Sequence, residues 1–397
     1  MTDLAVEYVE LGLRLGRHVD GLVDAYYGPA EISQRVDGEE LRDPAALVED
    51  AVRLREANGD GYLDAQLLGL ETVARKLAGE DFSYEDDVER CYGIRPERTH
   101  EDEFEAAHRK LDAVLPGSGS LADRYQAWRE RDPVPADQLA KVIDGVAREV
   151  RSRTAELVGL PPGESVEWGY VTDEPWAAYN YYQGGLRSRV DVNTEAAMSP
   201  TFVVHLVAHE TYPGHHTEHA WKEHLLVEGQ GKVEESLLLI ATPQSMISEG
   251  IAELAVEMAL GEEEQEITAK HVAGTGTPYD PELSRDVQEA AKSLSVRGNV
   301  ALMLHSDGRS QDEARDYLMR WALVSEHRAE QALRFITDPM WRSYATTYAD
   351  GYSLCKDFVD GNPGALQAAP DGAADAGRLD RLAIKCPFRP CPFVVPR

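Results

Sequence analysis

Cysteine and long apolar runs are both scarce in this chain of 397 residues. Its four cysteines, Cys91, Cys355, Cys386 and Cys391, are scattered, which excludes the disulfide framework of a small secreted domain. The segment CPFRPC holds two of them, but a second pair is missing, so it does not predict a zinc ribbon. No stretch approaches the roughly 18 consecutive apolar residues of a membrane-spanning helix, and we predict no membrane partner.

Positive charge is also scarce. The chain has 40 basic and 71 acidic residues, nine of the basic ones are lysine, and the formal net charge is −31. We predict no nucleic-acid partner, because binding phosphates needs a basic patch. An acid-rich, lysine-poor surface favours adaptation to high salt, where the Debye length shortens to about 3 Å and self-repulsion is screened. An acidic enzyme without such adaptation is the alternative.

The first residues, MTDLAVEYVELGLRLG, carry acids and lack the apolar core of a secretory signal, which favours a cytoplasmic location. Most of the chain then follows the three- and four-residue apolar periodicity of amphipathic helices. Two segments with period-two alternation, SVEWGYVTDEPW and LRSRVDVNT, predict short strands. We therefore predict a mainly α fold with a small β-sheet beside the histidine-bearing helix that follows it.

Changes in composition and pattern along the chain suggest three regions. Residues 1–160 form an N-terminal helical region, and residues 161–360 form the region that contains the histidine cluster. We expect these two to be one continuous domain. Residues 361–397 begin with the low-complexity run ALQAAPDGAADAG and are predicted to be a mobile tail.

The segment HETYPGHHTEH, residues 209–219, holds four of the twelve histidines and two glutamates. A zinc site needs two or three neutral imidazoles or carboxylates on one rigid face, with a position left open for water. A surface or capping cluster without metal is the alternative. So dense a group of imidazoles beside carboxylates is hard to explain by packing, and we predict one zinc ion.

Three pairings of histidines are open from the residues alone. His209 and Glu210 begin the H-E-x-x-H pattern, but Pro213 stands where the second histidine is expected and interrupts the helix. A Pro-Gly bulge lets His215, or failing that His216, take that place.

The second pairing is the inverted motif H-x-x-E-H, formed by His215, Glu218 and His219 without an interruption. The third is His205 with His209, four residues apart in HLVAH.

A further ligand is expected from MISEGIAELAVEM, where Glu249, Glu253 and Glu257 share one helical face. Carboxylates on an apolar helix are costly to bury unless they are paired or bind metal. A solvated acidic face is the alternative for Glu253 and Glu257. Glu249 is favoured because Gly250 follows it and allows another segment to approach.

HETYPGHH and SEGIAELAVE together resemble the bacterial and archaeal family catalogued as domain of unknown function 885. That family carries H-E-G-Y-P-G-H-H and, downstream, E-G-W-A-L-Y-A-E. The segments YEDDVERCYGI, VDVNT and EQALRFITDPMWRSYATTYADGYSL resemble other parts of it, so the resemblance spans roughly residues 80–360. Two positions depart from the pattern: Ile251 replaces a tryptophan, and Val256 stands where a later glutamate is expected.

The resemblance implies a mostly helical, gluzincin-type metallopeptidase. It implies zinc ligands at His209, Glu249 and either His215 or His216. Glu210 is then the general base that takes a proton from water and passes it to the leaving amine.

Two further roles are expected around that site. Tyr348 is our candidate to donate a hydrogen bond to the developing oxyanion, with Tyr212 behind it. Arg187, Arg189 and Arg334 are available to bind a free substrate carboxylate, which would indicate an exopeptidase acting on short peptides. A hydrolase of non-peptide amides or esters, and a non-catalytic protein that binds metal or peptide, are the alternatives.

Overall fold

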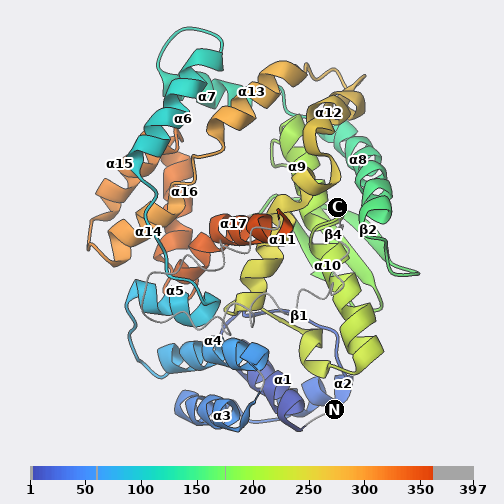
Figure 1. Ribbon diagram of the computed structural model, residues 1–397, viewed down its shortest axis with the longest axis vertical. Helices are drawn as coiled ribbons and strands as arrows, with labels where there is room; N and C mark the ends of the chain where they lie inside the picture. Colours follow the sequence, from blue (N-terminus) through green and yellow to red (C-terminus); the bar gives the residue numbers. More distant parts are fainter. Residues whose placement is uncertain (1–2, 60, 175, 361–397) are drawn as a thin grey trace.

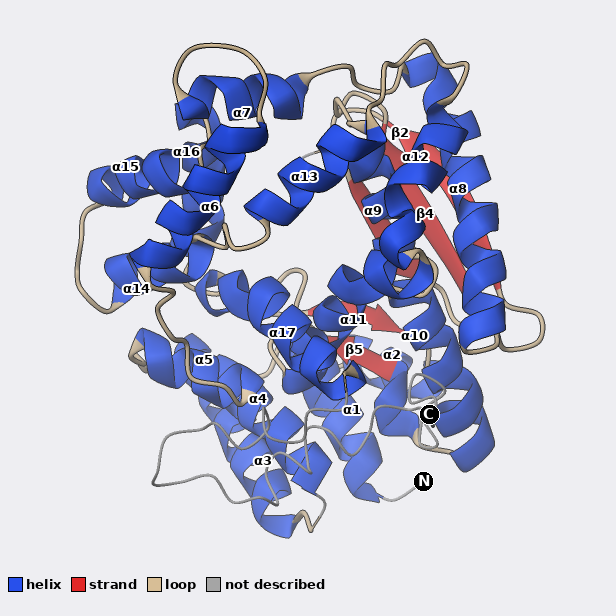
Figure 2. Ribbon diagram, turned by 45° about the horizontal axis from the view of Figure 1, so that its top comes forward, coloured by secondary structure: helices blue, strands red, loops and turns tan. Residues whose placement is uncertain are grey.

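The computed structural model describes residues 3–360 except residues 60 and 175, so the predicted tail at 361–397 lies outside the described residues. Helices make up most of the described chain, which confirms the predicted mainly α fold (Figure 2). The helices before the larger sheet are α1 (Asp3–Gly16), α2 (Ala30–Asp37), α3 (Pro44–Ala57), α4 (Gly61–Leu77), α5 (Tyr84–Tyr92), α6 (Glu101–Val114), α7 (Leu121–Glu130) and α8 (Ala136–Leu157). Those after it are α9 (Pro200–Glu210), α10 (His215–Lys222), α11 (Pro243–Ala259), α12 (Glu264–Val272), α13 (Pro281–Ala291), α14 (Arg297–His305), α15 (Gln311–Trp321), α16 (Glu326–Thr337) and α17 (Thr347–Val359).

Local sequence signals start several of these helices. Asp43 caps α3 by accepting a hydrogen bond from the backbone N–H of Ala45 at 2.9 Å, with proline at the first helical position. The same signal recurs at α9, where the Ser199 hydroxyl accepts from the N–H of Phe202 and a proline follows the cap.

The larger sheet has three strands, β2 (Ser165–Val171), β3 (Ala178–Tyr182) and β4 (Arg187–Asn193), in the order β2-β4-β3. The two predicted strands, β2 and β4, pair in parallel, and β3 pairs antiparallel with β4. A second, two-stranded sheet joins β1 (Val23–Tyr26) to β5 (Leu237–Leu239). The sequence analysis missed β1, β3 and β5, because β3 is partly covered on both faces and the other two are too short to show alternation.

Two large hydrophobic cores stabilise the molecule. The first joins α1, α3, α4 and α5 to α14, α15 and α16, and the second joins α8, α9, α12 and β4. Figure 1 shows the blue helices α1, α3 and α4 on one side of α11 and α17, with the green elements α8, α9 and β2 on the other. Because α11 contributes Met246 to the first core and Ala255 to the second, this helix ties the two together. Among the described residues, no helix is long and apolar enough to cross a lipid bilayer.

Helices α11 and α17 approach each other through glycine. A Cβ atom at Gly250 would lie 2.2 Å from the carbonyl oxygen of Gly351, and one at Gly351 would lie 2.4 Å from the carbonyl oxygen of Met246. The close approach expected of Gly250 is therefore present. It fixes the helix that carries Glu249 against α17.

We predict that Gly250→Ala lowers the free energy of unfolding by about 2 kcal/mol, because the added methyl group overlaps the backbone of α17. The matched control is Gly298→Ala in α14, where an added Cβ meets no atom within 4 Å. That change should stabilise the protein by about 0.5–1 kcal/mol through helix propensity. Denaturant unfolding at one salt concentration measures both, and equal effects of the two changes would contradict the packing account.

Candidate metal centre

The break between α9 and α10 brings two histidines together. Helix α9 ends at Glu210, and the Tyr212–Pro213 peptide bond that follows is cis. The backbone N–H of Gly214 donates to the carbonyl oxygen of Ala208 at 3.1 Å, and a Cβ atom at Gly214 would lie 1.9 Å from the carbonyl oxygen of His209. Only glycine fits this turn.

Helix α10 begins directly after the turn, at His215. The rings of His209 and His215 have centroids 4.8 Å apart and stand nearly perpendicular, at 87°. Their side chains are only 12% and 14% exposed. An uninterrupted helix would separate these two positions by about 9 Å along its axis, so the turn creates the pair.

Helix α11 adds a carboxylate to this pair. Glu249 is buried, with one oxygen 3.6 Å from His209 Nε2 and the other 3.7 Å from His215 Nε2. Ligand atoms about 2.1 Å from one zinc ion in tetrahedral geometry lie about 3.4 Å apart. The two nitrogen–oxygen distances are within a few tenths of an ångström of that spacing, and each histidine faces a different oxygen of Glu249.

The state of these groups also fits a metal. Burial, followed by the neighbouring His215 and His205, holds the pKa of His209 well below its usual value, so this imidazole is neutral and has a free lone pair. Oε2 of Glu249 and Nδ1 of His209 are buried without a hydrogen-bond partner in the described part of the chain. Oε2 of Glu249 faces Nε2 of His209 at 3.6 Å, and a buried polar atom without a partner is costly unless something binds it. The donor set of two imidazoles and one carboxylate suits zinc.

Neighbouring groups orient both imidazoles. Nδ1 of His215 lies 3.1 Å from the hydroxyl of Ser248, which donates its own proton to Glu218. The serine oxygen therefore accepts from His215 Nδ1–H, and Nε2 is the ring nitrogen that faces Glu249. On the other ring, Nδ1 of His209 lies 3.6 Å from a carboxylate oxygen of Glu253.

All three pairings that the sequence left open appear as possible donor sets in the structure, because His205, His209 and Glu253, and likewise His215, Glu218 and His219, also approach one another. The set of His209, His215 and Glu249 is the most favourable.

The two competing sets are each weakened by their surroundings. His205 and Glu253 lie at the rim, with side chains 34% and 29% exposed. Glu218 already accepts from Ser248 and lies 3.6 Å from Lys222, so its charge is compensated.

His216, the fallback ligand from the sequence, is not part of the centre. Its ring is fully buried and faces the opposite way, with Nε2 2.9 Å from Glu164 and Nδ1 2.8 Å from the Ser188 hydroxyl. Tyr212, expected near the oxyanion, also points away and donates to Glu164 at 2.6 Å. These two residues anchor the turn from behind instead of taking part in the site.

Glu210 lies on the cavity wall beside the pair, and the amide of Asn180 on β3 holds its backbone carbonyl oxygen. Burial raises the pKa of Glu210 to about 7, and the nearby carboxylates of Glu249 and Asp24 add to this shift. A carboxyl group with such a pKa both accepts and releases a proton near neutral pH, which is what a general base that later acts as an acid requires.

Two tyrosines also line the cavity. Tyr344 donates to Oε1 of Glu249 at 2.6 Å, and its ring packs edge-on against Tyr348. Burial raises the pKa of Tyr348 above its usual value, so its phenol keeps its proton and can donate. Tyr348 lines the cavity as expected, whereas Tyr344 was missed because nothing in the sequence distinguishes it from its neighbours.

The three arginines predicted to bind substrate do not line this cavity. Arg187 and Arg189 lie on the face of β4 opposite the buried residues Ser188 and Val190, and Arg189 pairs with Asp191 at 2.8 Å. Strand β3 stands at the edge of the sheet next to the cavity, so β4 is one strand further away. Arg334 is exposed on α16, where its neighbour Phe335 is the residue that reaches the cavity wall. Alternation predicts a strand but not which face meets the site.

The cavity itself has a volume of about 540 Å³ and is lined by residues from β1, β3, β5, α9, α10, α11, α16 and α17 and their connections. Its described lining contains three carboxylates and no lysine or arginine. The lining residues other than those of the centre are Gly21, Asp24, Trp176, Ala178, Tyr179, Asn180, His219, Leu238, Leu239, Ile240, Gln244, Ser245, Ser248, Phe335, Trp341, Tyr344 and Tyr348.

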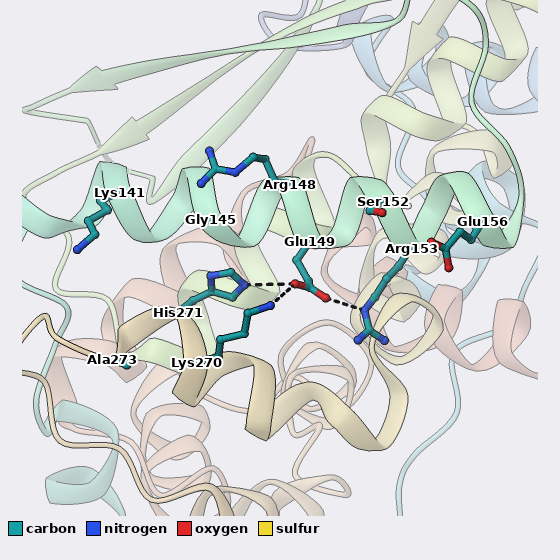
Figure 3. A pocket seen from close by; sticks show the side chains of 10 residues that line it. All are labelled: Lys141, Gly145, Arg148, Glu149, Ser152, Arg153, Glu156, Lys270, His271 and Ala273. Atoms are coloured by element: carbon teal, nitrogen blue, oxygen red, sulfur yellow. Dashed lines mark hydrogen bonds and ion pairs between the residues drawn. The ribbon is translucent and has the colours of Figure 1, made fainter.

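A second hollow lies between α8 and α12, away from the histidines (Figure 3). Three of its basic side chains lie near one carboxylate: Lys270 and Arg153 lie 2.6 and 3.1 Å from Glu149, and His271 lies 3.8 Å from it. Glu149 therefore largely balances the charges of Lys270 and Arg153. Among the described residues, this hollow shows no donor set like that of the metal centre.

Comparisons with known proteins bear on the fold. No model of a known protein family matches the sequence, and no curated protein matches it. The fold is similar to the crystal structure of a "putative lipoprotein" from Colwellia psychrerythraea, with a TM-score of 0.53 and 16% identity, over 89% of this chain and 64% of that one. A "putative lipoprotein of unknown function" from Shewanella oneidensis gives a TM-score of 0.46 and 16% identity, over 89% and 67%. This chain thus spans less than two thirds of the Colwellia protein, and the likeness shows the fold alone.

Glu164 links the turn to the rest of the protein, so its removal should be measurable. Burial alone would raise the pKa of Glu164, but hydrogen bonds from His216, Tyr212 and Arg151 outweigh it and hold that pKa at about 2. Because the folded-state pKa is depressed from 4.5, the stabilisation is complete above that pH and is lost as pH falls toward 2.

We predict that Glu164→Gln lowers the free energy of unfolding by roughly 3 kcal/mol at neutral pH, because buried partners lose their counter-charge. The difference from the wild type should narrow below pH 4.5. Denaturant unfolding between pH 7 and pH 3 checks this, with the exposed Glu156→Gln as control. A difference that stays constant across that range would contradict the account.

Proposed function

We propose that this chain is a zinc-dependent hydrolase that cleaves peptide bonds at the cavity between α9, α11 and β3. The observation that carries the proposal is the convergence of His209, His215 and Glu249 in one buried cavity that Glu210 also lines. The resemblance of HETYPGHH to gluzincin-type peptidases points the same way.

The roles of the chain's own residues follow from their positions. A zinc ion held by His209, His215 and Glu249 would lower the pKa of its water to about 7 and polarise a substrate carbonyl. Glu210 takes the proton of the attacking water and later gives it to the leaving amine. Tyr348 donates its phenol O–H to the carbonyl oxygen as negative charge develops there.

An extended peptide suits this cavity better than a compact ester or amide. Strand β3 has one partner, β4, among the described strands, and its residues Ala178, Tyr179 and Asn180 line the cavity. The free backbone groups of an edge strand can pair with the backbone of a substrate and align its scissile bond.

We predict that Glu210→Gln lowers kcat on peptide substrates by about 10²–10⁴-fold, because proton transfer is lost, while zinc content stays near that of the wild type. His215→Ala should lose the zinc, and His205→Ala, at the rim, should keep it. Elemental analysis and peptide hydrolysis on the same preparations check both. Full activity of the Glu210→Gln protein would contradict the mechanism, and a wild type without bound zinc would favour a non-catalytic protein.

We also propose a cytoplasmic, salt-adapted protein, supported by the excess of acidic over basic residues. The alternative comes from the relatives described as lipoproteins. Fractionation of cells that make this protein should recover it in the soluble fraction, and recovery with the membranes would contradict the proposal.

A further inference from the structure

One charged side chain of the cavity has no part in the mechanism above. Asp24 comes from β1, far in sequence from the histidine motif, and it lines the same cavity as Glu210 and Glu249. No lysine or arginine lines this space within the described chain. The cavity therefore holds three carboxylates. Their negative charge can be balanced by a metal ion at the centre and by a positively charged group of the substrate.

The position of Asp24 is fixed by a neighbour. The hydroxyl of Tyr179 on β3 donates to Oδ1 of Asp24, which joins the small β1-β5 sheet to the edge strand beside the cavity. Asp24 shares the cavity with Glu210 and Glu249, and its contact with Tyr179 keeps its carboxylate at the cavity wall. A carboxylate held this way, with water largely excluded, is costly unless a cation pairs with it.

We infer that Asp24 binds the protonated amine at the free N-terminus of the substrate, which makes the enzyme an aminopeptidase. An ammonium group offers three N–H donors and one positive charge, and it would form a charge-assisted hydrogen bond to Asp24. A free C-terminal carboxylate would instead meet the negative charge of Asp24 and no lysine or arginine, so the same cavity disfavours it. This inference rests on the proposed function and replaces the carboxylate-binding role first expected of the arginines.

The rest of the lining fits such a substrate. The aromatic rings of Trp176, Phe335 and Trp341 also line the cavity. Aromatic faces accept both an apolar side chain and, through their negative face, a neighbouring ammonium group. Asp24 thus binds the amine of the N-terminal residue through its charge. The aromatic rings bind the apolar side chain of that residue by burying its surface.

The test compares leucine p-nitroanilide with its N-acetylated form on zinc-loaded enzyme. The wild type should favour the free amine, and Asp24→Asn should reduce the ratio of the two kcat/KM values by about tenfold to a hundredfold. Asparagine keeps an oxygen that can accept from Tyr179, so this variant removes the charge and preserves the contact. Tyr179→Phe does the reverse and should retain most of the preference. Asp37→Asn, an exposed acid outside the cavity lining, should leave the ratio unchanged.

A binding measurement separates this inference from the proposed function. Calorimetry should detect leucinamide binding to the wild type, at least about tenfold weaker binding to Asp24→Asn, and weaker binding of N-acetyl-leucinamide to the wild type. Amine-dependent binding without hydrolysis of any peptide would support the amine site and contradict the hydrolase. Hydrolysis with the same ratio in the wild type and in Asp24→Asn would overturn the amine site and leave the hydrolase standing.

Discussion

The approach of Gly214 to the backbone of α9 is the constraint on which the site depends. Its α-carbon sits so close to the carbonyl oxygen of His209 that any side chain would collide with it. That contact lets α10 begin at His215 directly beside the end of α9. Side chains that one helix would hold about 9 Å apart are therefore brought together by two helices, and Glu249 approaches both from α11. The buried anchors Glu164 and His216 hold the turn from behind.

Electrostatics then decides what each buried group does. Burial, followed by the neighbouring His215 and His205, lowers the pKa of His209. Burial also acts to lower the pKa of His215, but the carboxylates of Glu249, Glu210 and Glu218 outweigh it and raise that pKa. The hydroxyl of Ser248 donates to Glu218 and accepts from Nδ1 of His215, so it links this ring to the carboxylate of Glu218. Apart from the imidazoles, the described lining of the cavity has no positively charged side chain to balance its carboxylates. A substrate with a protonated amine supplies that positive charge.

The sequence was most informative where function is local. Periodicity predicted the helices and the strands β2 and β4, and the dense histidine motif with the glutamate stripe pointed to the residues that now face one another. The residues taken alone left three pairings open, because the choice depends on Ser248, Lys222 and the exposure of the rim. The resemblance favoured His209 and Glu249 but left His215 and His216 as alternatives. The sequence misplaced the arginines because alternation does not say which face of β4 meets the cavity. Asp24 and Tyr344 gave no signal, since only the fold brings residues so distant in sequence to Glu249 and the cavity around it.

The most direct test of the account is the position of the metal. Crystals of the full chain grown with zinc, with diffraction recorded on both sides of the zinc absorption edge, would locate the ion by its anomalous signal. We expect one strong peak between Nε2 of His209, Nε2 of His215 and the carboxylate of Glu249. A peak enclosed by His215, Glu218 and His219, or one at the rim beside His205 and Glu253, would contradict the central claim.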